Sequence, residues 1–255
     1  MPFAILNTAR QGLAAAQAGV DVTGQNVANL NTPGYTRQRV EQSAAAPLHQ
    51  MGLGRVGTTT GGQGVRVDGV ARLSDVVLEN RVRQTASVAG YTAARAEAYG
   101  RVEDIHAEPS DRGLSAALSE FWAAWQDLAN APGQDAPGWV VIEKAGELAK
   151  HISAGRAQVE EAWSATRQAL EHQVTELNSL AEKVAALNGQ ARAAGAQGAS
   201  LNELVDQRNQ LTAQIARLAG GTAVPNPDGT GSVLLGGSFL VDGVRTYEGA
   251  VAGGT

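Results

Sequence analysis

The chain has 255 residues, 43% of them hydrophobic, so it is long enough and apolar enough to fold around a core. A formal net charge of −5 argues against a nucleic-acid partner, and the lack of cysteine excludes disulfides, thiolate metal sites and cysteine nucleophiles. Aromatic residues make up only 4% of the chain and glycines number 31, which favours thin helices packed along their length over a compact enzyme with an aromatic-lined pocket.

The first residues show no targeting signal of the cleaved kind. Residues 1–13 lack a positively charged start, and their apolar run ends at Asn7. A cleaved signal peptide and a membrane span both need a longer apolar run than this. Any export of the chain is therefore expected to use another route.

A seven-residue repeat runs through the first thirty residues. Its two registers alternate spacings of three and four, which places a narrow apolar stripe along one side of a helix and is typical of a coiled-coil strand. Three glycines inside this segment each cost about 1 kcal/mol relative to alanine, so we expect the helix to order only when a partner covers the stripe. We interpret residues 1–34 as an N-terminal assembly helix. The expected interface residues are Leu6, Ala9, Leu13, Ala16, Val20, Thr23, Val27 and Leu30.

A tight turn and an extended linker are predicted next. Pro33 fixes one backbone torsion and Gly34 permits positive φ, so the helix is expected to stop here. Residues 35–71 are polar and rich in glycine, and predict an extended linker that can hold one β-hairpin. Residues 52–57 match the pattern GxGxxG, but neither a strand nor a helix is predicted beside them. We therefore interpret that stretch as a flexible loop and not as a nucleotide site.

Residues 72–221 predict a long helical bundle. Apolar periodicity predicts helices over residues 73–105, 114–128, 139–193 and 201–219, with proline and glycine at the breaks. The third helix, at roughly fifty residues, would be about 75 Å long and form a rod. The tryptophans could form a sugar or peptide platform, but their helical spacing among leucines favours a core. The expected rod core is Phe121, Trp122, Trp125, Trp163, Leu204 and Leu211.

Two further features complete the predicted architecture. Asp206 and Arg208 are interpreted as part of a solvated helix face with ion pairs. Residues 222–255 predict the start of a β-rich region with short strands over 232–235 and 239–241, too few to close a sheet, so we expect the natural protein to be longer. The fold class is mainly α: an elongated helical rod or coiled-coil bundle with an N-terminal assembly helix and short β-hairpin segments.

The sequence offers no constellation for catalysis or metal binding. Its four histidines are scattered, and only Glu147 and His151 have helical i, i+4 spacing. Zinc needs three or four ligands, and neither an HExxH motif nor a GxSxG elbow is found. We therefore predict no catalytic residue, no metal, no cofactor and no enzymatic activity.

Three stretches resemble a known family. Residues 28–38, ANLNTPGYTRQ, follow the heptad helix and resemble the signature shared by bacterial flagellar rod, hook and hook-associated proteins. Residues 201–211, LNELVDQRNQL, and 121–132, FWAAWQDLANAP, are similar to segments of the flagellar hook-associated protein 1 family, although Asn209 stands where an acidic residue is expected. The signature turn consists of Asn29, Asn31, Thr32, Pro33, Gly34 and Tyr35.

This resemblance implies a flagellin-like and hook-associated-like structural subunit that joins hook to filament through coiled-coil contacts. Its implied partners are the hook protein, other hook-associated proteins, further copies in a ring or tube layer, and an export chaperone. It implies an extracellular place in the flagellum after type III export without a cleaved signal peptide. Family members have a β-rich outer domain and a C-terminal helix that pairs with the N-terminal one in the tube's inner layer. The resemblance therefore implies that residues 1–34 belong to that layer and that this chain is an N-terminal portion. Another hook or rod axial subunit and a secreted coiled-coil binding module are the alternatives.

Overall fold

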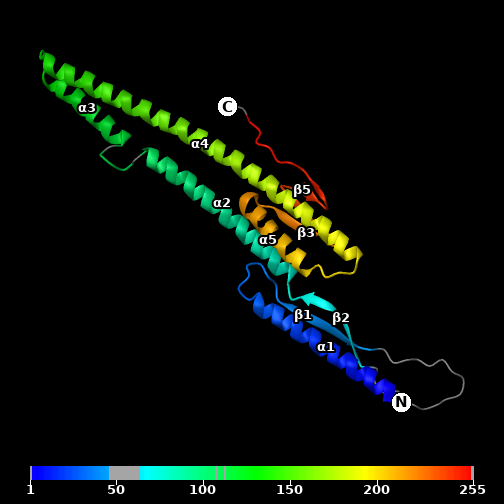
Figure 1. Ribbon diagram of the computed structural model, residues 1–255. Coiled ribbons are helices and arrows are strands. Elements are labelled where there is room, and N and C mark those ends of the chain that lie inside the picture. Colours follow the sequence, from blue (N-terminus) through cyan, green and yellow to red (C-terminus); the bar gives the residue numbers. More distant parts are fainter. Residues whose placement is uncertain (1, 46–63, 107, 112, 254–255) are drawn as a thin grey trace. The chain divides into compact units, whose positions relative to one another are not determined.

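The computed structural model describes residues 2–45, 64–106, 108–111 and 113–253 (Figure 1). The fold is mainly α with short antiparallel strands, which confirms the predicted fold class. The chain divides into two compact units, one formed by residues 1–87 and 179–248 and the other by residues 88–178 and 249–255. Helices α2 (Val76–His106) and α4 (Asp135–Ala196) contribute residues to both units.

The first unit begins with helix α1 (Pro2–Ala28) and two paired strands, β1 (Gln38–Ala44) and β2 (Val65–Arg72). The strands are antiparallel, with Gln38 opposite Arg72 and a register shift between Glu41 and Gln42. Ala15 and Val22 are buried on the side of α1 that packs against these strands. Helix α1 therefore has a second contact face, which the seven-residue repeat does not reveal. The GxGxxG pattern at 52–57 lies outside the described residues.

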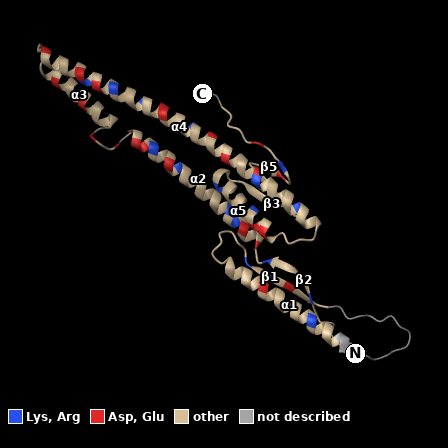
Figure 2. Ribbon diagram, in the orientation of Figure 1, with Lys and Arg blue, Asp and Glu red and all other residues tan. Residues whose placement is uncertain are grey.

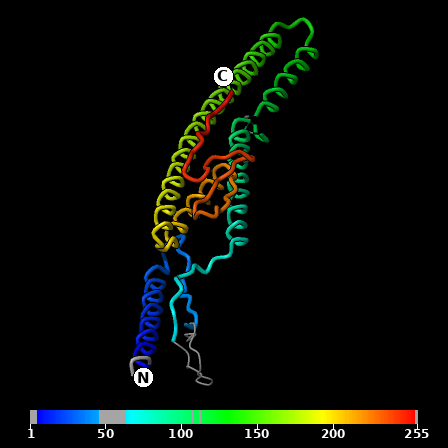
Figure 3. The backbone as a smooth tube through the Cα atoms, turned by 90° about the vertical axis from the view of Figure 1, so that its right-hand side faces the viewer, coloured from blue at the N-terminus to red at the C-terminus, as the bar shows by residue number. Residues whose placement is uncertain are grey.

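Helix α5 (Asn202–Ala219) and a four-stranded sheet complete the first unit. Figures 1 and 3 show α5 between the beginning of α2 and the end of α4. The core contains Val184 of α4, Ile215 of α5 and two sheet residues, Val233 and Val241, all at most 2% exposed. Gly220 ends α5 in the left-handed conformation, with φ of 75°, which glycine adopts without a Cβ penalty.

The sheet is more complete than the sequence predicts. Its strands β3 (Thr222–Pro225), β4 (Gly231–Leu235), β5 (Ser238–Asp242) and β6 (Arg245–Thr246) follow one another in antiparallel order. The expectation of too few strands is therefore wrong. It missed β3 because Pro225 lowers the strand propensity of that segment. Pro225 ends β3 opposite Gly231, at the edge of the sheet.

The second unit contains α3 (Leu114–Asn130) together with the later part of α2 and the earlier part of α4. Helix α4 has 62 residues and begins four residues before the predicted start, at Asp135. Pro137 is tolerated because it is the third helical residue, where the backbone N–H has no partner within the helix. Lys144 of α4 forms ion pairs with Glu120 of α3 and with Glu147, each at 2.9 Å. Glu147 is thus paired with a lysine, and α3 is tied to α4.

The predicted aromatic core differs most from the structure. Trp163 is 65% exposed, Trp122 57% and Trp125 46%, whereas Phe121, Leu204 and Leu211 are half-buried. Trp163 lies beside an open groove lined by Val102 and Ile105 of α2 and Val159 of α4. Most of the indole surface is exposed despite these neighbours. Helical spacing alone therefore does not predict whether Trp163 is buried.

We expect the replacement Trp163→Ala to lower the free energy of unfolding by less than about 1 kcal/mol, because most of the indole surface is already in water. Urea unfolding of the 255-residue chain measures this. Leu177→Ala, at a position only 7% exposed in the same unit, is the control and should cost about 2 to 5 kcal/mol. A cost of 3 kcal/mol or more for Trp163→Ala would restore the core interpretation.

Candidate assembly interface

The apolar stripe of α1 is exposed along its length. Its large members, Leu6, Leu13, Val20 and Val27, are between 64% and 71% exposed, and Leu30 beyond the helix end is 78% exposed. The small members, Ala9, Ala16 and Thr23, are exposed as well. A row of apolar side chains in water is unfavourable unless a partner covers it.

Charge is sparse on this helix. Helix α1 contains one basic and one acidic residue, Arg10 and Asp21, and Figure 2 shows most of its ribbon in the colour of neutral residues. At 100° per residue, both lie beside the stripe and not within it. A helix that approaches the stripe would therefore meet apolar side chains without having to desolvate a charge.

Asn26 joins the end of α1 to the strand that follows the signature turn. Its side-chain amide donates to the backbone oxygen of Gln38 at 2.8 Å, and its side-chain oxygen accepts from the backbone N–H of Gln38 at 2.8 Å. The Tyr35 hydroxyl donates to the same Asn26 oxygen at 3.0 Å. Burial, followed by the charges of Asp206 and Glu203, raises the pKa of Tyr35 above its ordinary value.

The other signature residues shape the turn itself. Asn29 donates to the backbone oxygen of Gln25 and accepts from the Thr32 hydroxyl, at 3.0 and 3.1 Å. Gly34 has φ of 79° and lies against Gln210, whose side chain a Cβ at this position would strike. The positive φ favours glycine here, whereas the end of the flexible Gln210 side chain can move aside. Asn31, Thr32 and Pro33 are exposed.

One face of α5 holds this turn. Four polar residues, spaced so that they share one side of the helix, point to the turn and the two strands. Asn202 donates to the backbone oxygen of Val70 at 2.8 Å, Glu203 accepts from Gln25 at 3.2 Å, and Gln210 donates to the backbone oxygen of Pro33. We call this set the α5 polar face; its members are Asn202, Glu203, Asp206 and Gln210.

Asp206 is the buried member of the α5 polar face, at 6% exposed. It accepts from the backbone N–H of Thr36 at 2.9 Å and from Nε of Arg72 at 2.8 Å. Arg72 also donates to Glu79 at 3.1 Å. The interpretation of Asp206 and Arg208 as a solvated face is therefore wrong. Helical periodicity does not show that the turn and strand β2 cover Asp206.

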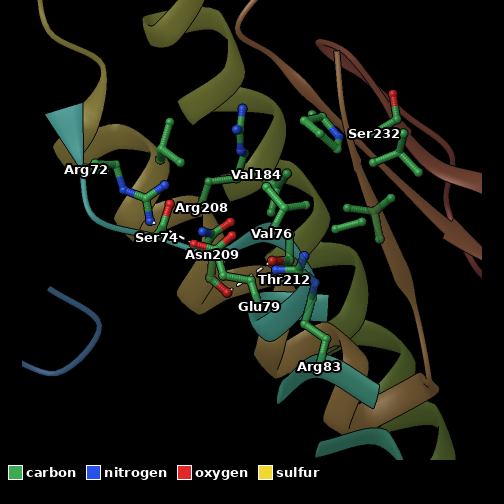
Figure 4. Close-up of a pocket in the computed structure, with 16 residues that line it drawn as sticks. Arg72, Ser74, Val76, Glu79, Arg83, Val184, Arg208, Asn209, Thr212 and Ser232 are labelled. Atoms are coloured by element: carbon green, nitrogen blue, oxygen red, sulfur yellow. Dashed lines mark hydrogen bonds and ion pairs between the residues drawn. The ribbon is translucent and has the colours of Figure 1, made fainter. Parts of the chain in front are cut away.

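Arg208 lies on a different face of α5 and is also buried. Its guanidinium donates to the side-chain oxygen of Asn188 at 3.1 Å and to the backbone oxygen of Gly229 at 2.8 Å. Figure 4 shows Arg208 beside a cavity of about 120 Å³ that Arg72, Glu79 and Arg83 also line. Burial, followed by the neighbouring charge of Arg72, lowers the pKa of Arg208. The cavity is lined by guanidinium groups that already have hydrogen-bond partners.

Two of the sequence motifs thus meet in space. The LNELVDQRNQL stretch supplies the residues that hold the signature turn, whereas the stripe remains exposed. The roles of Asn26 and Arg72 were missed. For Asn26, the signal in the sequence was that an amide side chain and Tyr35 stand on opposite sides of a tight turn. For the α5 polar face, the signal was the i, i+4, i+8 spacing of Asn202, Asp206 and Gln210.

Two kinds of feature, a membrane-spanning helix and a metal site, are not found in the described parts of the chain. Among these residues, none of the helices is long and apolar enough to cross a membrane. The same residues contain no cluster of three or more His, Asp or Glu side chains that could hold a metal ion.

Comparisons with known proteins agree with the motifs. The family model of the flagellar hook-associated protein FlgK helical domain matches residues 99–255, and that of the flagella basal body rod protein matches residues 6–36. Flagellar hook-associated protein 1 of Bacillus subtilis (strain 168) is 32% identical over 245 residues, which cover 91% of this chain and 48% of the relative. The protein of the same name from Salmonella typhimurium is 29% identical, covering 94% of this chain and 42% of its own length.

A solved structure has a similar fold. The flagellar hook junction protein FlgK from Burkholderia pseudomallei superposes with a TM-score of 0.56 and 25% sequence identity. The match covers 67% of this chain and 30% of that protein. This chain therefore spans less than half the length of the relatives it matches.

Proposed function

Since this chain belongs to the family of the flagellar hook-associated protein FlgK, we propose that it is a structural subunit of the bacterial flagellum that joins the hook to the filament. The observation that carries the proposal is the match of residues 99–255 to the FlgK helical domain, and the exposed, uncharged stripe of α1 supplies a surface for assembly. Apolar burial along such a stripe drives helices together.

In this proposal the stripe is the assembly surface. Its partners are helices of the hook protein, of other hook-associated proteins or of further copies in a ring or tube layer. The role is structural and not enzymatic, and it requires neither cofactor nor nucleic acid. The subunit acts outside the cell, in the flagellum, after chaperone-assisted type III export.

A hook or rod axial subunit is the second candidate function. The match of residues 6–36 to the basal body rod family favours it, because that segment holds the stripe and the signature turn. The match of residues 99–255 to the FlgK helical domain favours the junction. A secreted coiled-coil binding module is supported by the stripe alone.

Deleting the gene that encodes this chain tests the junction role. We expect the cells to build hooks, to lack filaments and to release filament subunits into the medium, because the hook end no longer offers a matching surface. Electron microscopy of the cells and immunoblots of the medium measure this. Cells that keep their filaments would contradict the junction role, and cells that lack hooks would favour the rod or hook alternative.

A further inference from the structure

Asp206 lies where four segments of the first unit meet. One carboxylate oxygen, Oδ2, accepts from the backbone N–H of Thr36, just before β1. The other, Oδ1, accepts from Arg72, the last residue of β2. Arg72 also donates to the Thr36 hydroxyl and to Glu79 in the first turn of α2, both at 3.1 Å. A single α5 carboxylate thus contacts the segment that leads into β1 and the last residue of β2, the two strands that pack on α1.

The connectivity of the chain makes this contact important for the direction of α1. Helix α1, the turn and strands β1 and β2 form the described N-terminal part of the chain, and we call residues 2–45 and 64–72 the assembly segment. Its C-terminal link to the helices runs through the residues after Arg72. The direction of α1 therefore also depends on non-covalent contacts, which come from the α5 polar face and from the ion pair of Arg72 with Glu79.

The chemistry of the contact requires a carboxylate. The Thr36 N–H and the Arg72 guanidinium are both donors, so each oxygen of Asp206 must accept. An amide offers one oxygen and one NH₂ group, so it would turn a donor towards one of the two donors. The side chains of Arg72 and Asp206 are 12% and 8% exposed, so water is a poor substitute acceptor.

We propose that Asp206 is a positioning residue that fixes the direction of α1 relative to α5. The stripe then meets its partner helix in one orientation. This inference rests on the proposed function, because it assigns the stripe to assembly. In this role Asp206 does not touch the partner; it acts through Thr36 and Arg72.

The absence of cysteine permits a direct measurement on the full 255-residue chain. Gln17 of α1 and Gln214 of α5 are exposed, and Gln17→Cys with Gln214→Cys provides two sites for spin labels. Pulsed electron paramagnetic resonance then gives the distribution of distances between the two helices. We expect a narrow distribution in the parent and one at least about twofold wider in Asp206→Asn, because one donor loses its acceptor.

Two further variants decide the result. Glu182→Gln, at an exposed position of α4, is the matched carboxylate-to-amide control and should keep the narrow distribution. Arg72→Met with Asp206→Leu fills the space of the pair with apolar groups, which is compatible with folding, but leaves the Thr36 N–H without its acceptor. We expect this double variant to keep the circular dichroism of the parent and to unfold cooperatively in urea, which shows that it is folded, and to widen the distribution. A parental width in the folded double variant would overturn the inference, whatever the stability of Asp206→Asn.

Assembly in cells separates this inference from the proposed function. We expect Asp206→Asn to reduce the fraction of filamented cells by about tenfold or more, because a lost charge-assisted hydrogen bond can change an equilibrium by about that factor. Wider distances with normal filaments would overturn the positioning role and leave the junction role intact. Failure of the junction role would appear in the gene deletion, as cells that keep their filaments, and would leave the distance measurement unchanged.

Discussion

A protein in which Leu13 and Val20 are both replaced by Asp should unfold in urea like the parent but fail to join hook to filament. The two side chains are 71% and 70% exposed, so the replacements remove little buried contact and should change the free energy of unfolding by less than about 1 kcal/mol. In the assembly, the same two carboxylates would enter a packed seam, which costs several kcal/mol unless they find partners. Swimming assays and immunoblots of the medium for filament subunits measure the outcome.

The control places the same change on another side of α1. Asn7 and Ala14 are exposed and each follows a stripe residue, so they lie about 100° around the helix from the stripe. Asn7→Asp with Ala14→Asp should leave both stability and swimming unchanged. Normal swimming of the Leu13 and Val20 variant would show that the stripe is not the assembly surface. A loss of stability in that variant would show that the stripe contributes to folding.

The largest loss of stability is expected at Asn188, which is fully buried. Its amide nitrogen donates to the backbone oxygens of Gly231 and Gly243, at 2.7 and 2.6 Å. Its oxygen accepts from the Gly231 N–H at 2.9 Å and from Arg208 at 3.1 Å. Asn188→Ala takes the amide partner from three buried backbone groups and one of two acceptors from Arg208, which keeps its bond to Gly229, and should cost about 3 to 5 kcal/mol. Urea unfolding of the chain measures this.

Asn178, ten residues earlier on α4, provides the matched control. Its side chain exchanges two hydrogen bonds with the backbone of Gly249, at 3.0 and 2.9 Å, but it is only half-buried. Water can replace those bonds, so Asn178→Ala should cost about 1 kcal/mol. Equal losses for the two variants would mean that burial adds nothing to the role of Asn188.

Several features of this chain follow from short-range sequence patterns. The helices were predicted because apolar spacing and glycine or proline breaks act within a few residues. The predicted helix over residues 201–219 ends at a glycine, and Gly220 is the residue that ends α5. The stripe of α1 could be read in the same way, because a seven-residue repeat defines one side of a helix irrespective of the rest of the fold. The signature turn was also local, since Pro33 and Gly34 act through their own torsions.

Burial, in contrast, was decided by the tertiary structure. Asp206 and Arg208 look like a solvated pair in the sequence, yet the turn and β2 cover the first, and Asn188 and Gly229 bind the second. Trp163 looks like core and is mostly exposed. A periodic pattern shows which residues share a side of one helix, but the segments that cover that side come from distant positions in the sequence. The sequence by itself therefore determined the helices, the stripe and the turn, and only the packing of distant segments decided which polar groups are buried and how they hold the turn.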